Sequence, residues 1–532
     1  MEAFIVANMA PIMFASLVVV LLLGYPVAFA LAFNGLLWGV IGISLGLFQP
    51  TFFQALPERI FGVMSNETLL AIPFFTFMGL ILERSGMAEE LLDTVGQLFG
   101  PIRGGLAYAV IFVGALLAAT TGVVAASVIA MGLISLPIML RYGYDRRLAT
   151  GVIAASGTLA QIIPPSLVLI VMADQLGKSV GDMYSGAVVP GVVLAALYAL
   201  YVLLVTIIRP TYAPALPAEF RTLRGVKLLL RVIVALIPPL ILIFLVLGTI
   251  FIGVATPTEG GAMGAVGALA LAALKGRFSW TIVRQALEST TKLSAFVLFI
   301  LIGSRVFSLT FYGVNGHVWV ENLLTGLPGG QVGFLIVVNL LVFVLAFFLD
   351  FFELAFIVVP LVGPAAEHLG IDLIWFGVLL GINMQTAFMH PPFGFSLFYL
   401  RSVAARRPYK DRVTGIMTQP ITTGQIYWGA VPFVLIQVLM IAITIAFPGM
   451  VMRYKAGEVH IDPSKMEIQA PDASGNAGPD FNTGTPNFGT TPAPDAGAPA
   501  GPNFGIAPAP SGTEAPAGPN LGAPVQPAPS GQ

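Results

Sequence analysis

One sequence fragment occurs twice in this chain, each time with a pair of prolines inside an apolar stretch. The first copy reads Gly-Thr-Leu-Ala-Gln-Ile-Ile-Pro-Pro-Ser over residues 157–166, and the second reads Met-Gln-Thr-Ala-Phe-Met-His-Pro-Pro-Phe over residues 384–393. Proline inside a helix removes a backbone hydrogen bond and kinks or breaks the helix. A duplicated, proline-broken apolar segment is typical of secondary transporters, in which such segments form the binding site near the middle of the membrane.

The sequence around each proline pair repeats as well. Upstream, a Gly-x-Asp element stands at Gly143–Asp145 and again at Gly370–Asp372, at the same offset from the prolines. Downstream, Asp-Met-Tyr-Ser-Gly-Ala at residues 182–187 is echoed by Gln-Ile-Tyr-Trp-Gly-Ala at residues 425–430. We therefore predict that the two halves of the chain are structural repeats.

The composition places the chain in a membrane. Apolar residues make up 57% of it and charged residues 10%, the formal net charge is -1, and there is no cysteine. Apolar runs of about twenty residues recur along the sequence, as expected for a polytopic membrane protein. Nothing in the sequence suggests nucleic-acid binding, a disulfide framework or a phosphate-binding loop. Any pumping must therefore draw on an ion gradient or a partner subunit.

Two apolar segments are too long for a single span at about 1.5 Å per residue. The segment 106–141 carries the small, polar stretch Thr-Thr-Gly-Val-Val-Ala-Ala-Ser at its middle, and the segment 332–362 carries Asp-Phe-Phe-Glu. Each is predicted to be a re-entrant hairpin, which membranes tolerate where the backbone lines a cavity or is buried in protein. Each precedes a broken helix, at 148–177 and at 373–400. The predicted fold is thus all-α and polytopic, an inverted-repeat transporter with two hairpins and two Pro-Pro broken helices.

This pattern divides the chain into five parts. They are scaffold spans with a connecting helix over 1–66, a first transport repeat over 67–208, a cytoplasmic loop with scaffold spans over 209–288, a second transport repeat over 289–450, and a tail over 456–532. The tail is rich in Pro, Ala, Gly, Asn and Thr and repeats Pro-Asn-Phe-Gly, which predicts disorder. It is either a solubilising extension or a segment that binds a partner or the cell wall.

Two clusters of basic residues set the predicted orientation. Cytoplasmic loops of membrane proteins carry an excess of Lys and Arg, so both clusters are placed in the cytoplasm. The clusters follow different spans of the two repeats, which requires the repeats to be inverted, with one extra span in the first. The clusters are Arg209, Arg221, Arg224, Lys227 and Arg231, and then Arg401, Arg406, Arg407, Lys410 and Arg412.

Several separated motifs occur along the chain in a fixed order. They are Ile-Pro-Phe-Phe-Thr-Phe-Met-Gly at 72–79 with Glu-Arg-Ser-Gly at 83–86, the Pro-Pro element at 157–166, and Ala-Thr-Pro-Thr-Glu-Gly-Gly-Ala at 255–262. Between residues 10 and 450 the chain resembles the large membrane subunit of TRAP (tripartite ATP-independent periplasmic) transporters. Two segments, Phe-Leu-Asp-Phe-Phe-Glu at 348–353 and the second proline segment over 385–400, are further similar to the branch of that family for 2-oxo acids or for mannitol and chloroaromatic compounds.

This resemblance implies a tripartite machine in the bacterial inner membrane. A periplasmic substrate-binding protein would deliver an organic acid, usually a carboxylate, to a complex of this subunit with a small four-helix membrane subunit. The resemblance also implies Na+ as the coupling ion, no other cofactor, and an elevator mechanism in which both hairpins and both broken helices slide against a fixed scaffold. The expected function is sodium-coupled uptake of a small organic acid, with a 2-oxo acid as the candidate.

The candidate site residues can be read from the chain itself. Unwinding a helix at a Pro-Pro pair frees carbonyl oxygens, and a half-helix N-terminus presents amide hydrogens to an anion. Neutral oxygens at the first tip and first broken helix suit a hard cation. The alternative is that small residues and prolines only allow close helix packing. The predicted ion- and substrate-binding residues are Thr120, Thr121, Gly122, Ser127, Gly157, Thr158, Gln161, Pro164, Pro165, Asp350, Glu353, Asn383, Gln385, Thr386, Pro391 and Pro392, with Thr121, Ser127, Gly157, Thr158, Asp350, Gln385 and Thr386 as sodium candidates.

Ionisable and aromatic residues near these segments carry separate predictions. Ionisable groups at membrane depth are costly and usually functional, so Asp350 and Glu353 are candidates to bind a cation or carry a proton. The alternatives are a solvated tip or a carboxylate held by backbone amides. Glu259 is expected to be structural at a helix start, and His390 to be neutral and hydrogen-bonded, with a proton-sensitive gate as the alternative. Candidates for an apolar side of the pocket, against simple packing, are Phe351, Phe352, Phe393 and Phe395.

Three other functions fit parts of the sequence. A membrane-embedded enzyme would need a nucleophile with a base or a metal cluster, but the chain has four His, no Cys and no His-x-x-x-His pair. A passive channel would conduct independently of an ion gradient and of a binding protein. A stand-alone proton-coupled carboxylate carrier would transport without partners and is the main alternative.

Overall fold

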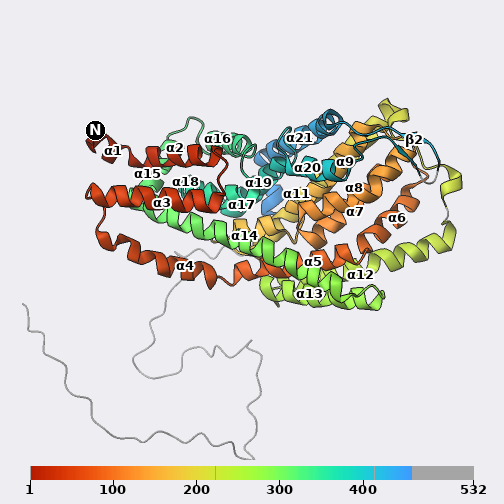
Figure 1. Ribbon diagram of the computed structural model, residues 1–532, viewed down its shortest axis with the longest axis horizontal. Coiled ribbons are helices and arrows are strands. Elements are labelled where there is room, and N and C mark those ends of the chain that lie inside the picture. The colour runs from red at the N-terminus through yellow and green to blue at the C-terminus, as the bar shows by residue number, and fades with distance from the viewer. Residues whose placement is uncertain (1, 222, 412–413, 458–532) are drawn as a thin grey trace, which may run out of the picture. The chain divides into compact units, whose positions relative to one another are not determined.

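The structure is built almost entirely from α-helices (Figure 1). This computed structural model describes residues 2–221, 223–411 and 414–457, so the predicted disordered tail lies outside the described residues from residue 458 onward. Within the described part, six helices are long and apolar enough to cross a membrane, or up to nine if each bent pair is one span. The prediction of an all-α polytopic membrane protein is confirmed.

Most helices follow one another with short connections, and the two long connections lie between α11 and α12 and between α20 and α21. Those before residue 209 are α1 (Glu2–Ala7), α2 (Met9–Leu22), α3 (Val27–Ser44), α4 (Leu56–Met64), α5 (Ala71–Arg84), α6 (Met87–Phe99), α7 (Gly105–Thr121), α8 (Val124–Arg141), α9 (Arg146–Thr158), α10 (Leu167–Gln175) and α11 (Val180–Ile208). Those after it are α12 (Gly225–Phe251), α13 (Pro257–Leu274), α14 (Trp280–Gly313), α15 (Gly316–Thr325), α16 (Gly330–Leu345), α17 (Phe351–Ile357), α18 (Val359–His368), α19 (Leu373–Met384), α20 (Phe395–Val403), α21 (Thr423–Ala446) and α22 (Gly449–Met452). Two short strands, β1 (Tyr409–Lys410) and β2 (Met417–Thr418), pair antiparallel.

Helix α3, in the predicted scaffold spans, packs closely along α14, which lies mostly in the predicted second transport repeat (Figure 1). A Cβ atom on Gly303 would lie 2.4 Å from the carbonyl oxygen of Ala28, and one on Gly35 would lie 2.7 Å from that of Val306. The hydroxyl of Thr310 donates a 2.8 Å hydrogen bond to the Gly35 carbonyl. Small residues at such crossings let two backbones approach, which is how membrane helices associate.

The first predicted hairpin is present as α7 and α8. The chain reverses at Gly122, whose φ of 58° is in the left-handed region that favours glycine. The two arms end side by side, since the backbone N–H of Leu106 donates a 3.2 Å hydrogen bond to the Tyr144 hydroxyl. A chain that returns to its starting end is what the length of this apolar segment predicted.

The second hairpin consists of α16, a non-helical tip, α17 and α18. Gln331 at the start of α16 donates a 2.7 Å hydrogen bond from Nε2 to the carbonyl of Leu369, just after α18. This hairpin also returns to its starting end. It is longer than the predicted range 332–362, because the helices extend from Gly330 to His368.

Both broken helices are interrupted at the predicted prolines. After α9, a short 3-10 helix (Leu159–Gln161) leads into the cis peptide Pro164–Pro165 before α10 begins. After α19, a second 3-10 helix (Gln385–Phe388) leads into the cis peptide Pro391–Pro392 before α20 begins. The two repeats thus share one sequence of elements, from hairpin to broken helix.

The breaks are held by matching hydrogen bonds. In each repeat, a serine hydroxyl donates to the backbone carbonyl three residues before the first proline. In the first repeat, Ser166 Oγ donates to the Gln161 carbonyl at 2.5 Å. In the second repeat, Ser396 Oγ donates to Phe388 at 2.5 Å. The duplicated tyrosines also act alike, because Tyr184 donates to the Ser166 carbonyl at 3.5 Å and Tyr427 donates to the Pro392 carbonyl at 3.2 Å.

The duplicated Gly-x-Asp elements end one helix and begin the next. Gly143 and Gly370 have φ values of 80° and 71°, which stop the hairpin helices. The Asp145 carboxylate then accepts hydrogen bonds from the N–H groups of Arg147 and Leu148 at the start of α9. Asp372 does the same at the start of α19. The motif is therefore a helix stop followed by an N-cap.

The two broken helices enter from opposite ends. α9 begins beside the end of α11, where the Asp145 N–H donates to the Tyr212 carbonyl at 2.8 Å. α21 begins there too, since Gln425 lines one cavity with Asp145. α19 begins at the other end of α21, because Lys455 beyond that helix donates from Nζ to Asp372 at 2.7 Å. The repeats are therefore inverted, as predicted.

The described residues of both basic clusters lie at one end of the helices, called here the basic end, whereas Arg412 lies outside the described residues. Arg141, at the end of α8, forms a 2.8 Å ion pair with Asp411 in the loop that carries the second cluster. The Arg141 guanidinium holds the pKa of the Asp411 carboxyl well below its usual range. Arg209 of the first cluster follows α11, beside Asp145. That this end faces the cytoplasm stays a prediction from its excess of positive charge.

Helices α9 and α21 cross at a pair of glycines near the basic end. A Cβ atom on Gly151 would lie 2.1 Å from the Gly429 carbonyl oxygen, and one on Gly429 would lie 2.3 Å from the Arg147 carbonyl oxygen. Gly424, one turn earlier in α21, has nothing within 4 Å of an added Cβ atom. The crossing therefore has no room for a side chain, although the same helix does have room at Gly424.

We expect Gly429→Ala to destabilise the protein. Overpacking a tight crossing costs about 1–3 kcal/mol, which should lower the thermal unfolding temperature of the detergent-solubilised protein. The matched control is Gly424→Ala in the same helix, which should leave that temperature unchanged or raise it because alanine favours helix over glycine by about 1 kcal/mol. Equal unfolding temperatures for the two variants would contradict the close crossing.

Candidate functional site

One cavity lies where the two hairpins and the two broken helices meet, and we call it the central cavity. Its volume is about 430 Å³. Both repeats contribute to its wall, together with α14. Its lining residues are Gly122, Val123, Val124, Ala125, Gln161, Leu167, Leu293, Phe296, Phe348, Asp350, Phe351, Phe352, Glu353, Phe388, Phe395 and Tyr399. Of the predicted site residues, Gly122, Gln161, Asp350 and Glu353 therefore come together here.

Four helices begin at the wall of the central cavity. Val124 and Leu167 open α8 and α10, and Phe351 and Phe395 open α17 and α20. A helix N-terminus carries free N–H groups and a partial positive charge. The start of α10 is capped by Ser166 and that of α17 by its own acids, whereas the starts of α8 and α20 have no side-chain cap and favour a negatively charged occupant, such as a carboxylate.

Asp350 and Glu353 lie at the tip of the second hairpin and hold the start of α17. The Asp350 carboxylate accepts a 2.9 Å hydrogen bond from the Glu353 N–H, and the Glu353 carboxylate accepts one of 2.9 Å from the Asp350 N–H. This capping box matches the alternative in which backbone amides bind the acids. Both side chains also line the central cavity, so the groups that start α17 face its contents.

Gln161 supplies a further polar group to the cavity wall. The residue is only 1% exposed, and its Oε1 atom has no hydrogen-bond partner among the described side chains. A buried acceptor without a donor costs free energy. The position therefore suits a cation or a donor group of a bound molecule.

One side of the central cavity is aromatic. The Phe351 ring lies 3.8 Å from that of Phe352 and 6.1 Å from that of Phe388, between ring centroids. Phe388 in turn lies 5.9 Å from Phe395. Of the four predicted wall residues, three line the cavity, whereas Phe393 is 50% exposed and lies outside its lining.

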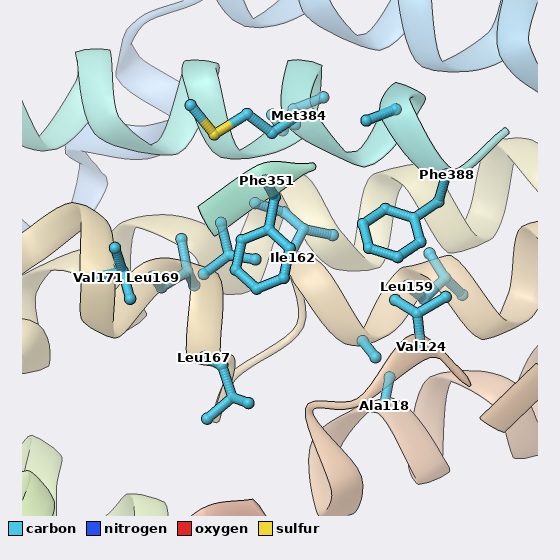
Figure 2. Close-up of a cluster of buried hydrophobic side chains, with 14 of the residues drawn as sticks. Ala118, Val124, Leu159, Ile162, Leu167, Leu169, Val171, Phe351, Met384 and Phe388 are labelled. Atoms are coloured by element: carbon cyan, nitrogen blue, oxygen red, sulfur yellow. The ribbon is translucent and has the colours of Figure 1, made fainter. Parts of the chain in front are cut away.

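An apolar core joins the two repeats next to this aromatic wall. Figure 2 shows Phe351 and Phe388 of the second repeat beside Leu159 and Val124 of the first. Ala118, near the end of α7, lies in the same cluster. The first hairpin, both proline breaks and the second hairpin tip therefore share one buried core.

A second group of buried polar side chains lies where both broken helices meet α11 and α21, and we call it the polar crossing. Gln385 Nε2 donates to the Thr158 hydroxyl at 2.9 Å, and Gln437 Nε2 donates to the Tyr198 hydroxyl at 3.0 Å. All four residues are fully buried. The Oε1 atoms of both glutamines have no partner among the described side chains.

Half of the polar crossing was not predicted. Thr158 and Gln385 were sodium candidates, whereas Tyr198 and Gln437 were missed. The available signal was Gln437, an amide inside an apolar stretch of a 24-residue helix, whereas Tyr198 is one of three tyrosines in a 29-residue helix and was not singled out by the sequence. Such groups usually hydrogen-bond across helices in membranes.

Asn383 and Thr386 connect the second broken helix to the second hairpin. Asn383 Nδ2 donates to the carbonyl of Asn339 in α16 at 2.7 Å and to its side-chain oxygen at 3.0 Å. The Thr386 hydroxyl donates to the Asn383 carbonyl at 2.6 Å. Neither residue lines the central cavity.

The remaining predicted residues pack in the interior, form the proline breaks, or have side chains outside the described part of the chain. Gly157 packs against Val128, from whose Cγ2 atom an added Cβ would lie only 2.3 Å away, which fits the close-packing alternative. Ser127 is buried within α8. The side chains of Thr120 and Thr121 lie outside the described part of the chain. The four prolines form the two cis peptides at the breaks: Pro164, Pro165, Pro391 and Pro392.

The prediction of a hydrogen-bonded His390 is wrong. The residue is 1% exposed, and neither ring nitrogen has a hydrogen-bond partner among the described residues. Its ring lies 4.3 Å from that of Phe347 and 4.2 Å from that of Phe343. Phe343 lies near the end of α16 and Phe347 follows that helix, so an aromatic surface occupies the place of a polar partner.

The prediction of a structural role for Glu259 is confirmed. Its carboxylate accepts a 2.8 Å hydrogen bond from the Thr256 N–H, and its own N–H donates to the Thr256 hydroxyl at 3.2 Å. This capping box starts α13. Glu259 does not line the central cavity, unlike Glu353 in the same motif.

Comparison with known proteins identifies the family. The profile described as tripartite ATP-independent periplasmic transporter, DctM component, matches residues 14–450. The chain belongs to this family. It is therefore a large permease subunit of a TRAP transporter and a multi-pass membrane protein, which fits the bacterial inner membrane.

Curated relatives agree with this assignment. A C4-dicarboxylate TRAP transporter large permease of Pseudomonas aeruginosa is 32% identical over 370 residues, covering 68% of this chain and 83% of the relative. A protein of the same description from Vibrio cholerae is 32% identical over 419 residues, covering 74% and 89%. An ectoine TRAP transporter large permease of Halomonas elongata is 27% identical, covering 83% and 97%. These relatives are permeases, so the chain is not an enzyme.

A solved structure shares the fold. The YdaH transporter of Alcanivorax borkumensis matches with a TM-score of 0.53 at 16% sequence identity, covering 75% of this chain and 88% of that one. At this identity the likeness concerns the fold alone. It agrees with a transporter architecture for the TRAP large permease described here.

We expect Tyr198→Phe to destabilise the protein through the polar crossing. Removal of the hydroxyl takes away the nearest partner of Gln437, and a buried donor left unpaired costs about 1–3 kcal/mol. The matched control is Tyr201→Phe. Tyr201 lies on the same helix and packs against the same ring, since Tyr198 and Tyr201 lie 5.2 Å and 5.1 Å from Phe433.

Thermal unfolding in detergent measures both tyrosine variants. The unfolding temperature should fall for the first variant and change little for the second. A fall of the same size in both would mean that ring packing, and not the hydroxyl of Tyr198, determines the effect.

Proposed function

We propose that this TRAP permease takes up a small organic acid by coupling its entry to Na+. The acid belongs to the dicarboxylate or 2-oxo acid class, and a periplasmic binding protein delivers it to a complex of this chain with a small four-helix membrane subunit. The family and the C4-dicarboxylate relatives support the substrate class.

The observation that carries this proposal is the central cavity. It lies at the point where both inverted repeats converge, which is where transporters of this architecture bind substrate. The uncapped N-termini of α8 and α20 favour a carboxylate there, and the aromatic wall accommodates an apolar carbon skeleton. About 430 Å³ is ample for a four-carbon acid.

Two groups of oxygen ligands support the coupling ion. The carboxylates of Asp350 and Glu353 and the amide oxygen of Gln161 are the oxygens at the cavity wall that suit a hard cation. The polar crossing holds further neutral oxygens, on Thr158 and Gln385. An ion bound beside the substrate would offset the repulsion between a carboxylate substrate and the acids.

An elevator motion fits the distribution of contacts. The two broken helices are joined by the hydrogen bond from Gln385 to Thr158, and the second is joined to the second hairpin by the bond from Asn383 to Asn339, which supports their movement as a unit. The closely packed pair of α3 and α14 is the candidate for the fixed scaffold. Phe296 and Leu293 of α14 reach the cavity wall, which places the cavity at the boundary between the two groups.

We expect uptake to need both sodium and the binding protein. The measurement is uptake of radiolabelled succinate and, separately, of radiolabelled pyruvate into proteoliposomes that hold this chain and its small subunit. Sodium and proton gradients are compared, each with and without the binding protein. Uptake by this chain alone on a proton gradient would contradict the proposal and favour the stand-alone carrier.

Paired capping-box variants test the role of the acids in the same assay. Gln can replace Glu in a capping box, so Glu353→Gln removes the charge and keeps the start of α17. It should raise the half-saturating sodium concentration at least severalfold, whereas Glu259→Gln, in the other box away from the cavity, should not. Asp350→Asn keeps an N-cap and should uncouple uptake from sodium. Unchanged sodium dependence in Glu353→Gln and Asp350→Asn would reduce both acids to a structural role.

A further inference from the structure

A second cleft lies at the basic end, between α11 and α21 and beside the start of α9. It consists of two adjoining cavities of about 550 Å³ and about 330 Å³. The two cavities share Asp145, Arg147, Arg209 and Tyr212 in their linings. We call this continuous space the arginine cleft. None of the residues that line the arginine cleft lines the central cavity.

The larger cavity is strongly basic. Arg146, Arg147 and Arg209 line it, and none of the three forms an ion pair with an acid among the described residues. The acid in its lining is Asp145, whose carboxylate already accepts hydrogen bonds from the N–H groups of Arg147 and Leu148. Positive charge is therefore in excess, and guanidinium groups suit phosphate oxygens.

One of these arginines is held in position. Arg209 donates a 2.7 Å hydrogen bond from Nη1 to the Tyr212 hydroxyl, and its guanidinium carbon lies 5.1 Å from the centre of the Tyr212 ring. These contacts orient the Arg209 guanidinium without neutralising its charge. A pre-oriented cation loses less side-chain entropy when it binds an anion.

The smaller cavity continues the cleft along the apolar faces of two membrane-spanning helices. Tyr201, Val205 and Ile208 of α11 face Trp428 and Pro432 of α21 across it. Ile208 is 73% exposed and Trp428 is 65% exposed, as for side chains that meet lipid. Tryptophan is enriched at the boundary between membrane and water. The basic pocket therefore opens onto an apolar groove at the membrane interface.

We propose that the arginine cleft binds an anionic phospholipid, with the phosphate among the arginines and an acyl chain in the groove between α11 and α21. Basic pockets between helices on the cytoplasmic side of membrane proteins bind acidic lipid headgroups. A free phosphate ion would satisfy the arginines but would leave the apolar groove unused. The lipid satisfies both parts of the cleft.

The test measures phosphatidylglycerol retained by the purified full-length protein after reconstitution in mixed phosphatidylglycerol and phosphatidylcholine nanodiscs and extraction into detergent. The double variant Arg147→Gln/Arg209→Gln should retain at least about fivefold less phosphatidylglycerol, which corresponds to a loss of roughly 1 kcal/mol. The matched control is Arg406→Gln/Arg407→Gln, which removes the same charge from two exposed arginines at the same end. This control should retain the wild-type amount.

A groove variant separates lipid from free phosphate. Ile208→Asn replaces an exposed apolar side chain of the groove without removing an arginine and should also lower phosphatidylglycerol retention. Inorganic phosphate at millimolar concentration should neither displace the lipid nor raise the thermal unfolding temperature.

Three outcomes would overturn the proposal. Equal loss of lipid in both double variants would indicate nonspecific charge attraction. Full retention in Ile208→Asn, together with stabilisation by phosphate, would indicate a free-anion site. Full retention in Arg147→Gln/Arg209→Gln would show that the cleft binds no acidic lipid.

Discussion

The structure depends on one constraint, which is that backbone polar groups inside a membrane need partners within the protein. Each proline pair frees carbonyl groups in the middle of an apolar segment. The two repeats solve this in the same way, with Ser166 and Ser396 donating to the freed carbonyls. Tyr184 and Tyr427 add a second donor beside each proline pair. Because the breaks are stabilised from within, the helix ends that they create remain available to face the central cavity.

Inversion of the repeats brings these helix ends together. α9 starts at the basic end and α19 starts at the opposite end, so their interruptions meet in the interior of the protein. The hairpins follow the same symmetry and bring their tips to the same place. The result is a cavity with four helix N-termini, two carboxylates and an aromatic wall. Each repeat alone would provide only half of this environment.

The main features of the fold could be predicted from the sequence because they follow from local sequence patterns. Pro-Pro pairs break helices, Gly-x-Asp elements stop one helix and cap the next, and apolar segments that exceed one span must turn back. The same local signals identified the second hairpin tip and Gln161 as cavity residues. The second hairpin continues past its predicted end at residue 362, because α18 extends to His368.

Other parts of the site depend on contacts between segments that are distant in sequence. Thr158 and Gln385 were recognised, but their pairing with Tyr198 and Gln437 arises only when four helices cross. His390 was expected to have a polar partner, whereas Phe343 and Phe347 surround it. Glu259 and Glu353 also differ in a way that the local sequence does not show. Both start a helix with a capping box, and only tertiary structure places one of them at the cavity.

Protection of introduced thiols tests most directly whether both repeats line one substrate site. The chain has no cysteine, so Ala125→Cys at the first tip and Phe348→Cys at the second hairpin each supply a unique thiol. The measurement is the rate of modification by a small methanethiosulfonate reagent, with and without sodium and the transported acid, and Gly424→Cys is the control outside the cavity. The account predicts slower modification at both cavity positions and no change at the control. Protection at only one of the two positions, or at neither, would contradict it.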